Sequence, residues 1–257
     1  MSDVLVCIKR VPDTGGEVSL DEDGMNIDIA HLGATVSPHE EAAIELAVQQ
    51  AGATDGEVTV LSLGDDNAVE QLRDAVALGC TNAVLVEATP ARFGPRDIAL
   101  AIADVVRSHE EQGRSYDLIL LGNDAADTGD FQVGVRLGYA LERPVVTGIS
   151  TVELRDGHVV ATGDSPTGGN QVYEIALPAV VTVMEGGVEP RYPSIPGRMK
   201  AKRAKIETVE PEREPDGSGR VRLVLPPAPS SQVRVLGEGP EAAPAVADLL
   251  QELGVLR

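Results

Sequence analysis

A polar, glycine-bearing stretch from Gly122 to Gly134 is the part of this sequence best suited to hold a small anion. It reads GNDAADTGDFQVG and lies between an apolar run and a helix-like segment. Free backbone N–H groups at such a helix start suit a phosphate. The same stretch also fits an ordinary loop whose acids cap the next helix. Its three aspartates, Asp124, Asp127 and Asp130, could instead ligate Mg²⁺, although solvated acidic clusters are commoner.

Two further features should meet this loop, because parallel sheets bind ligands at the carboxyl ends of their strands. The first is Cys7, near the end of the apolar run Val4–Ile8. The second is Ser37-Pro38 at the start of a helix, together with Leu63 at the end of the second strand. Neither GxGxxG after the first strand nor GxxxxGK[ST] occurs. No set of residues offers an acid, a base and a nucleophile together. This combination favours a carrier or regulatory subunit over a stand-alone catalyst.

Short apolar strands that alternate with amphipathic helices position these residues. Ser37 can cap the first helix, Pro38 suits its first position, and Glu40 completes a capping box. The predicted strands are Val4–Ile8 and residues 57–63, 83–86, 118–121 and 144–146. Four helices are predicted: one begins at residues 37–38, one begins at residue 65 or 66, and the other two cover residues 95–109 and 131–141. The alternation predicts an α/β fold with a parallel sheet flanked by helices.

The alternation stops near Gly148. An Asp-Gly turn predicts a hairpin of residues 151–154 and 158–162, and two more strands follow at 171–176 and 178–183. We then expect an acidic linker at 207–219, a possible strand at 221–225 and a helix at 242–253. The predicted organisation is a nucleotide-binding α/β domain over residues 1–185, and an arm, linker and tail over 186–257 that pack on a partner subunit.

Composition excludes several classes of protein. The chain has 257 residues and a formal charge of −20, which argues against nucleic-acid binding. No apolar run reaches the roughly 20 residues of a membrane span, and no secretory signal is evident. Two cysteines and four scattered histidines give neither a disulfide framework nor metal-ligand spacing. We expect a cytoplasmic protein with no metal site and no membrane insertion.

A cationic segment interrupts this acidic chain. Residues 190–206 contain no acid and six basic residues, namely Arg191, Arg198, Lys200, Lys202, Arg203 and Lys205. A basic arm on an acidic body is suited to reach a partner. We call residues 190–205 the arm.

The arm, PRYPSIPGRMKAKRAK, resembles the recognition segment of the electron transfer flavoprotein β subunit family, in which a PRY stretch leads to a Met-Lys-Ala-Lys run. The resemblance extends through residues 4–11, Ser37-Pro38 and the loop Gly122 to Gly134, and so spans the chain. It implies an adenine-nucleotide α-hydrolase-like fold and a heterodimer whose α subunit holds most contacts to an FAD. It further implies an AMP in this subunit, electron donation by flavin dehydrogenases, and a quinone oxidoreductase or other acceptor.

The resemblance also assigns roles to residues. Positions that match the family's nucleotide contacts are Cys7, Ser37, Pro38, Leu63, Gly122, Asp124, Asp127, Gly129, Asp130, Phe131, Gln132, Val133 and Gly134. Partner-binding positions are Arg191, Tyr192, Ile195, Pro196, Met199, Lys200 and Lys202. Ile195 takes the place of the apolar anchor, held between two prolines.

Two departures leave the nucleotide open. Housekeeping members carry Asn-Gln-Thr-Gly where this chain has Phe131 to Gly134, and the Gln-Val-Gly ending is similar to the electron-bifurcating branch, which binds a second FAD. That branch reads Asp-Gly-Asp-Thr-Ala where this chain has residues 127–131. Thr14 also replaces an aromatic that housekeeping members place near the flavin. An ATP-cleaving hydrolase or ligase of the same fold is a further alternative, but residues 7–14 lack its SGGxDS-like loop.

Overall fold

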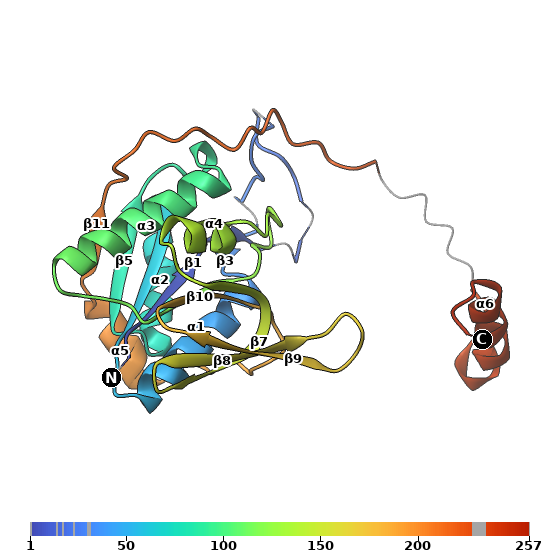
Figure 1. Ribbon diagram of the computed structural model, residues 1–257. Helices are drawn as coiled ribbons and strands as arrows, with labels where there is room; N and C mark the ends of the chain where they lie inside the picture. Colours follow the sequence, from blue (N-terminus) through green and yellow to red (C-terminus); the bar gives the residue numbers. More distant parts are fainter. Residues whose placement is uncertain are drawn as a thin grey trace. The chain divides into compact units, whose positions relative to one another are not determined.

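The computed structural model describes residues 2–13, 15–16, 18–22, 24–29, 32–227 and 235–256. They divide into two compact units, Met1–Leu223 and Val224–Arg257. The first unit is built on one nine-stranded sheet in the order β11-β5-β4-β1-β6-β10-β7-β8-β9 (Figure 1). The second contains the short helix η3 (Gly239–Ala242) and α6 (Ala243–Glu252). Thr14 lies outside the described residues.

The order of the parallel strands reverses at the centre of the sheet. β1 (Val4–Ile8) pairs in parallel with β4 on one side and with β6 on the other. The parallel strands are β1, β4 (Val58–Gly64), β5 (Asn82–Glu87), β6 (Leu118–Gly122), β7 (Val145–Arg155), β10 (Ala179–Val183) and β11 (Ile206–Val209). In a sheet of this kind, the crevice beside the reversal is the usual ligand site.

Helices cover both faces of the sheet (Figure 1). α1 (Pro38–Ala53), α2 (Val69–Leu78) and α5 (Ile195–Arg203) pack on one face, and α3 (Pro95–Glu111) and α4 (Val133–Ala140) pack on the other. β1 is apolar on both sides because alternate residues point to opposite faces: Val4, Val6 and Ile8 join one core, and Leu5 and Cys7 join the other. The predicted α/β class and its flanking helices are confirmed.

The remaining elements lie at the margins of the sheet. β8 (His158–Asp164) and β9 (Asn170–Ala176) extend it as an antiparallel hairpin. A separate pair, β2 (Val11–Pro12) and β3 (Ala34–Thr35), lies outside it, and η1 (Asp66–Ala68) and η2 (Pro90–Arg92) precede α2 and α3. In the described part of the chain, no helix is long and apolar enough to cross a membrane.

The structure corrects three predicted elements. The predicted strands at residues 144–146 and 151–154 belong to one continuous strand, β7, which passes through Gly148 at a φ of +71°. Residues 206–209 form the edge strand β11 beside β5, so residues 207–209 do not begin the predicted acidic linker. Residues 221–225 form no strand. The first compact unit runs to Leu223.

Candidate functional site

A cavity of about 390 Å³ lies at the carboxyl ends of β1, β4 and β6, beside the reversal of strand order. Apolar side chains from the sheet and from α3 form part of its wall, and the loop between β6 and α4 forms another part. Among the predicted cofactor residues, those that line the cavity are Cys7, Leu63, Gly122, Asp124, Asp127, Asp130, Phe131, Gln132, Val133 and Gly134. The structure therefore brings together residues that lie more than a hundred positions apart.

Three predicted cofactor residues are not part of this lining: Ser37, Pro38 and Gly129. Ser37 contacts a lining residue, since its Oγ lies 3.4 Å from the carbonyl oxygen of Asp124. Pro38 begins α1 directly after Ser37. Gly129 has a φ of +57°, and it allows the loop to turn just before Phe131.

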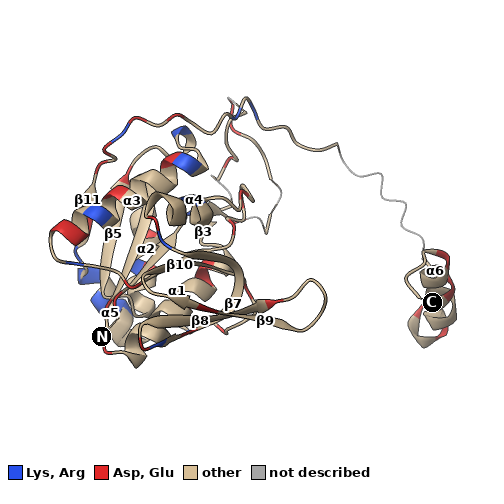
Figure 2. Cartoon of the chain, in the orientation of Figure 1, with Lys and Arg blue, Asp and Glu red and all other residues tan. Residues whose placement is uncertain are grey.

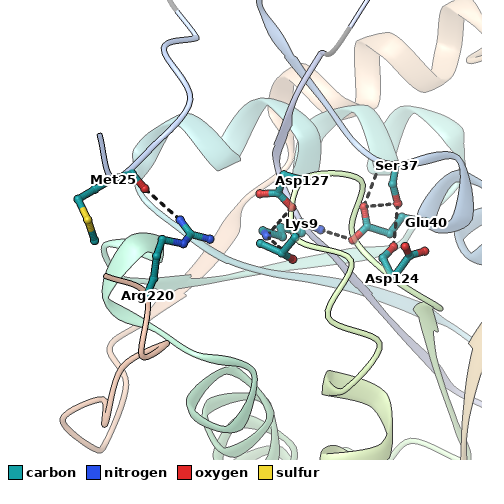
Figure 3. A network of polar contacts seen from close by, with 8 residues as sticks. Lys9, Met25, Ser37, Glu40, Asp124, Asp127 and Arg220 are labelled. Carbon is teal, nitrogen blue, oxygen red and sulfur yellow. Dashed lines mark hydrogen bonds and ion pairs between the residues drawn. The ribbon is translucent and has the colours of Figure 1, made fainter. Parts of the chain in front are cut away.

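Glu40 is a buried carboxyl group in the cavity wall. One oxygen accepts the N–H of Lys9 at 2.8 Å, and the other accepts the N–H and the hydroxyl of Ser37 at 3.0 and 3.2 Å (Figure 3). Burial raises the pKa of Glu40 to about 8, although the hydrogen bonds from Ser37 and Lys9 oppose the rise. Burial therefore favours the protonated, neutral form of this side chain near neutral pH.

The cations and acids of the cavity are partly paired with one another. Lys9 Nζ lies 2.7 Å from a carboxylate oxygen of Asp127 and 3.5 Å from the hydroxyl of Thr128 (Figure 3). This pair links the end of β1 to the β6–α4 loop. Burial raises the pKa of the Cys7 thiol well above its ordinary value. Cys7 is thus a small apolar wall residue and not a thiolate nucleophile.

A second polar cluster fixes the start of the loop. The side-chain oxygen of Asn123 accepts the Thr182 hydroxyl at 2.7 Å and the N–H of Gly148 at 3.0 Å. Gly134 then passes so close to β10 that an added Cβ would lie 2.2 Å from the Thr182 methyl carbon. The absence of a side chain at Gly134 lets α4 pack against the sheet beside the cavity.

Both phenylalanines of the chain, Phe93 and Phe131, line this cavity. Phe131 has a φ of +51°, an uncommon conformation for a bulky residue, and its side chain is 58% exposed. Such strain persists where the surrounding structure imposes it, and it concentrates at ligand sites. The aromatic lining suits a planar ring.

The sequence did not point to several lining residues. Asn26, Pro90, Ala91, Phe93, Ser218, Arg220 and Leu223 line the cavity without having been predicted. Phe93 could have been suspected from composition, since it is one of only two phenylalanines. Residues 218–223 carry no such signal, because only tertiary contacts bring them to the cavity.

The arm forms the helix α5 on the surface of α2. Ser194 caps it by accepting the N–H of Gly197 at 3.1 Å, and Arg73 of α2 donates to the carbonyl oxygen of Ala201 at 2.6 Å. Gly197 allows the close approach, because a Cβ there would lie 2.3 Å from the carbonyl oxygen of Ala77. The arm is therefore a packed helix at residues 195–203 and not extended throughout.

All seven predicted partner residues are exposed on the arm. Tyr192, Ile195 and Met199 are 92%, 78% and 57% exposed, which is unusual for large apolar side chains that have a core available nearby. Pro196, Lys200 and Lys202 are also exposed. Figure 2 shows Lys and Arg gathered on α5.

Arg191 behaves differently from the other predicted partner residues. Its Nε and Nη2 donate to the two carboxylate oxygens of Glu45 at 2.6 and 2.8 Å, and its backbone N–H adds a third bond at 3.1 Å. Glu45 is buried, and the bonds from Arg191 hold the pKa of its carboxyl below the ordinary value. Arg191 thus fastens the start of the arm to α1.

Comparison with known proteins identifies the family. A family model described as an electron transfer flavoprotein domain matches residues 25–214. A Syntrophomonas wolfei protein named electron transfer flavoprotein subunit beta is 33% identical over 250 residues, which cover 96% of this chain and 95% of the relative. The chain belongs to the electron transfer flavoprotein family. The predicted resemblance to this family is thereby confirmed.

Other relatives of this electron transfer flavoprotein chain are similar over much of its length. A Bacillus subtilis protein, also named electron transfer flavoprotein subunit beta, is 32% identical over 96% of this chain and 97% of its own. An Anaerotignum propionicum protein named acryloyl-CoA reductase electron transfer subunit gamma is 30% identical over 77% of this chain and 73% of its own. Membership in this family places the chain in electron transfer and disfavours the ATP-cleaving alternative.

Proposed function

We propose that this chain is the β-type subunit of a heterodimeric electron transfer flavoprotein. Together with an α subunit, it accepts electrons from flavin-dependent dehydrogenases and passes them to a quinone oxidoreductase or another acceptor in the cytoplasm. The names of the S. wolfei and B. subtilis relatives, which align along almost the whole chain, support the subunit assignment. Electron transfer in this proposal belongs to the assembled heterodimer.

The cavity holds an adenine nucleotide in this proposal: AMP, or alternatively a second FAD. The observation that carries the proposal is the cavity itself, in which the polar loop Gly122 to Gly134 faces an apolar wall beside the strand reversal. Phe93, Phe131 and Ile98 suit the planar base, and the polar loop suits sugar and phosphate. A bound FAD supplies one- and two-electron chemistry, and the residues of this chain bind and orient the nucleotide.

The segment 186–257 packs on the partner subunit in this proposal. Within the second unit, α6 and the residues after it leave large apolar side chains exposed, namely Val246, Leu253, Val255 and Leu256. A short helix gains little stability in water unless its apolar face is buried. A partner surface would supply that burial.

Identification of the nucleotides tests the proposal. The chain is produced together with its α subunit, the purified complex is denatured, and the released nucleotides are separated and quantified. One FAD and one AMP per heterodimer are expected for a simple electron shuttle, and two FAD for an electron-bifurcating protein. Release of one FAD and no second nucleotide would contradict the proposed site in this chain.

Ile195→Ala tests the role of the arm. Ile195 is 78% exposed on a helix that Gly197 and Arg191 hold in place, so truncation should remove an apolar contact with a dehydrogenase without disturbing the cavity. Loss of a well-packed anchor typically costs about 2 kcal/mol or more, so we expect reduction by a dehydrogenase at limiting concentration to slow by about thirtyfold or more. The rate is measured by stopped-flow flavin absorbance, with the flavin content determined in parallel.

Tyr139→Ala is the matched control, since Tyr139 is 79% exposed on α4 and lies outside the arm. It should leave the reduction rate close to that of the wild type. An unchanged rate in Ile195→Ala would remove the anchor role from this residue.

A further inference from the structure

Residues 211–223, which we call the strap, cross the beginning of α3 as an extended segment. Asp97, three residues into α3, accepts the N–H groups of Asp216 and Gly217 at 3.1 and 2.9 Å as well as that of Gly94. Arg213 adds a 3.0 Å ion pair with Asp104. These bonds fix the first half of the strap to α3.

The second half of the strap is fixed to the loop that precedes β3. Leu223 donates its N–H to the carbonyl oxygen of Gly24 at 2.7 Å, and Arg220 Nη1 donates to the carbonyl oxygen of Met25 at 3.1 Å (Figure 3). Between these two attachments, Ser218, Arg220 and Leu223 line the cavity. The strap therefore forms one wall of the site.

The charges of the lining residues distinguish Arg220 from Lys9. Lys9 forms an ion pair with Asp127, with 2.7 Å between Nζ and a carboxylate oxygen. Arg220 is hydrogen-bonded to a neutral carbonyl group, and no carboxylate among the described residues forms an ion pair with it. Asp130 adds negative charge to the same cavity, whereas Asp124 lies 2.5 Å from Nδ1 of His39. An anionic ligand would need a cation that is not already neutralised.

A phosphate group meets that description. A guanidinium presents five N–H donors in a planar fork that matches phosphate oxygens, and one bond to Met25 leaves most of these donors available. The alternative, that Arg220 only fastens the strap, uses one donor. It explains neither the place of Arg220 in the cavity lining nor the lack of an ion pair with any described carboxylate.

We propose that Arg220 binds the phosphate of the adenine nucleotide in this cavity, and that the strap thereby completes the site. This inference rests on the proposed nucleotide site, and it names the side chain that recognises the anionic part of the ligand. The strap lies outside the loop Gly122 to Gly134 and some ninety residues after it in the sequence. Specificity for a phosphorylated ligand then comes from the strap together with the polar loop, and recognition of the base comes from the apolar part of the cavity.

Comparison of AMP with adenosine separates a phosphate contact from a structural role. Wild type, Arg220→Gln and Arg220→Lys are purified as heterodimers and freed of nucleotide, and binding of AMP and of adenosine is measured by calorimetry. We expect Arg220→Gln to weaken AMP binding by about tenfold or more, as for loss of a charged hydrogen bond, and to leave adenosine binding unchanged. Arg220→Lys should retain part of the AMP affinity.

Salt dependence gives a second readout that a structural role would not change. The AMP affinity of wild type should fall as ionic strength rises, and that of Arg220→Gln should fall less steeply. Arg222→Gln, an exposed position on the same strap, is the matched control and should behave as wild type in both measurements.

Two results would overturn the inference alone: an AMP affinity in Arg220→Gln equal to that of wild type, or equal losses of AMP and adenosine binding. The latter would show that Arg220 only holds the strap. Failure of the wild-type protein to bind AMP, adenosine or FAD would overturn the proposed nucleotide site, and this inference with it.

Discussion

Glu40→Gln should remove a large part of the pH dependence of stability. Burial raises the pKa of Glu40 from its ordinary 4.5 to about 8 in the folded chain, whereas the unfolded chain leaves it near the ordinary value. Between these values the folded state holds a proton that the unfolded state has released. The contribution of Glu40 to stability is therefore complete below pH 4.5 and is lost as pH rises toward 8, by a total on the order of 4 kcal/mol.

The measurement is the free energy of unfolding by denaturant from about pH 5 to about pH 9. As pH rises across this range, the free energy of unfolding of the wild type should fall relative to that of Glu40→Gln, because the glutamine stays neutral. Glu111→Gln, at an exposed position on α3, should give a curve parallel to that of wild type. Parallel curves for Glu40→Gln would show that Glu40 is ionised in the folded protein.

The same proton should influence ligand binding. Glu40 lines the cavity, so its ionisation near pH 8 would place a negative charge close to any bound phosphate. Nucleotide affinity should then fall as pH rises through 8 in wild type, and much less in Glu40→Gln. Both the free energy of unfolding and the nucleotide affinity should therefore change with the ionisation of Glu40, over the same pH range.

Gly134→Ala should destabilise the protein by about 1–3 kcal/mol and weaken nucleotide binding. In a helix, this substitution would normally stabilise by up to about 1 kcal/mol. Here the new Cβ would lie 2.2 Å from the methyl carbon of Thr182, a distance that real contacts do not reach. Thr182 is buried and its hydroxyl is bonded to Asn123, so it cannot rotate away without breaking that bond.

Thr182→Ser provides a sharp test of this cause, because it removes the clashing methyl group and keeps the hydroxyl. The double variant should recover much of the loss, which a double-mutant cycle on denaturant unfolding measures. Gly52→Ala, at an open position of α1, should instead stabilise the chain by roughly 0.4–1 kcal/mol. If Gly134→Ala costs the same with and without Thr182→Ser, the contact with Thr182 is not the cause.

The sequence was most informative where local chemistry agrees with the fold. The apolar run Val4–Ile8 favours a strand buried on both faces, and Ser37, Pro38 and Glu40 indicate the start of α1; the structure confirms both. The loop Gly122 to Gly134 was found because polar and glycine residues follow a strand directly. Each of these signals lies within a few residues, which is why it could be read without coordinates.

The strap and β11 could not be found in this way. Ile206–Val209 is short and precedes acidic and proline residues, so the local pattern favours a linker. It becomes a strand because β5 offers a free edge, and because Glu207 bonds to buried His109 at 3.2 Å and to Arg114 at 3.1 Å. The sequence likewise predicts Glu40 only as a capping residue, because its second role in the cavity wall depends on burial.

The hairpin strand β9 ends the sheet order, and it offers the peptide groups of its outer side to any chain that approaches. Val172 and Tyr173, 65% and 38% exposed, would make such an approach favourable. Each chain carries a formal charge of −20, and the repulsion between two such chains opposes this association. At 0.1 M salt, the repulsion reaches over a Debye length of about 10 Å. At about 1 M salt this length falls to about 3 Å, so the chain produced without a companion should associate edge to edge in concentrated salt and redissolve on dilution.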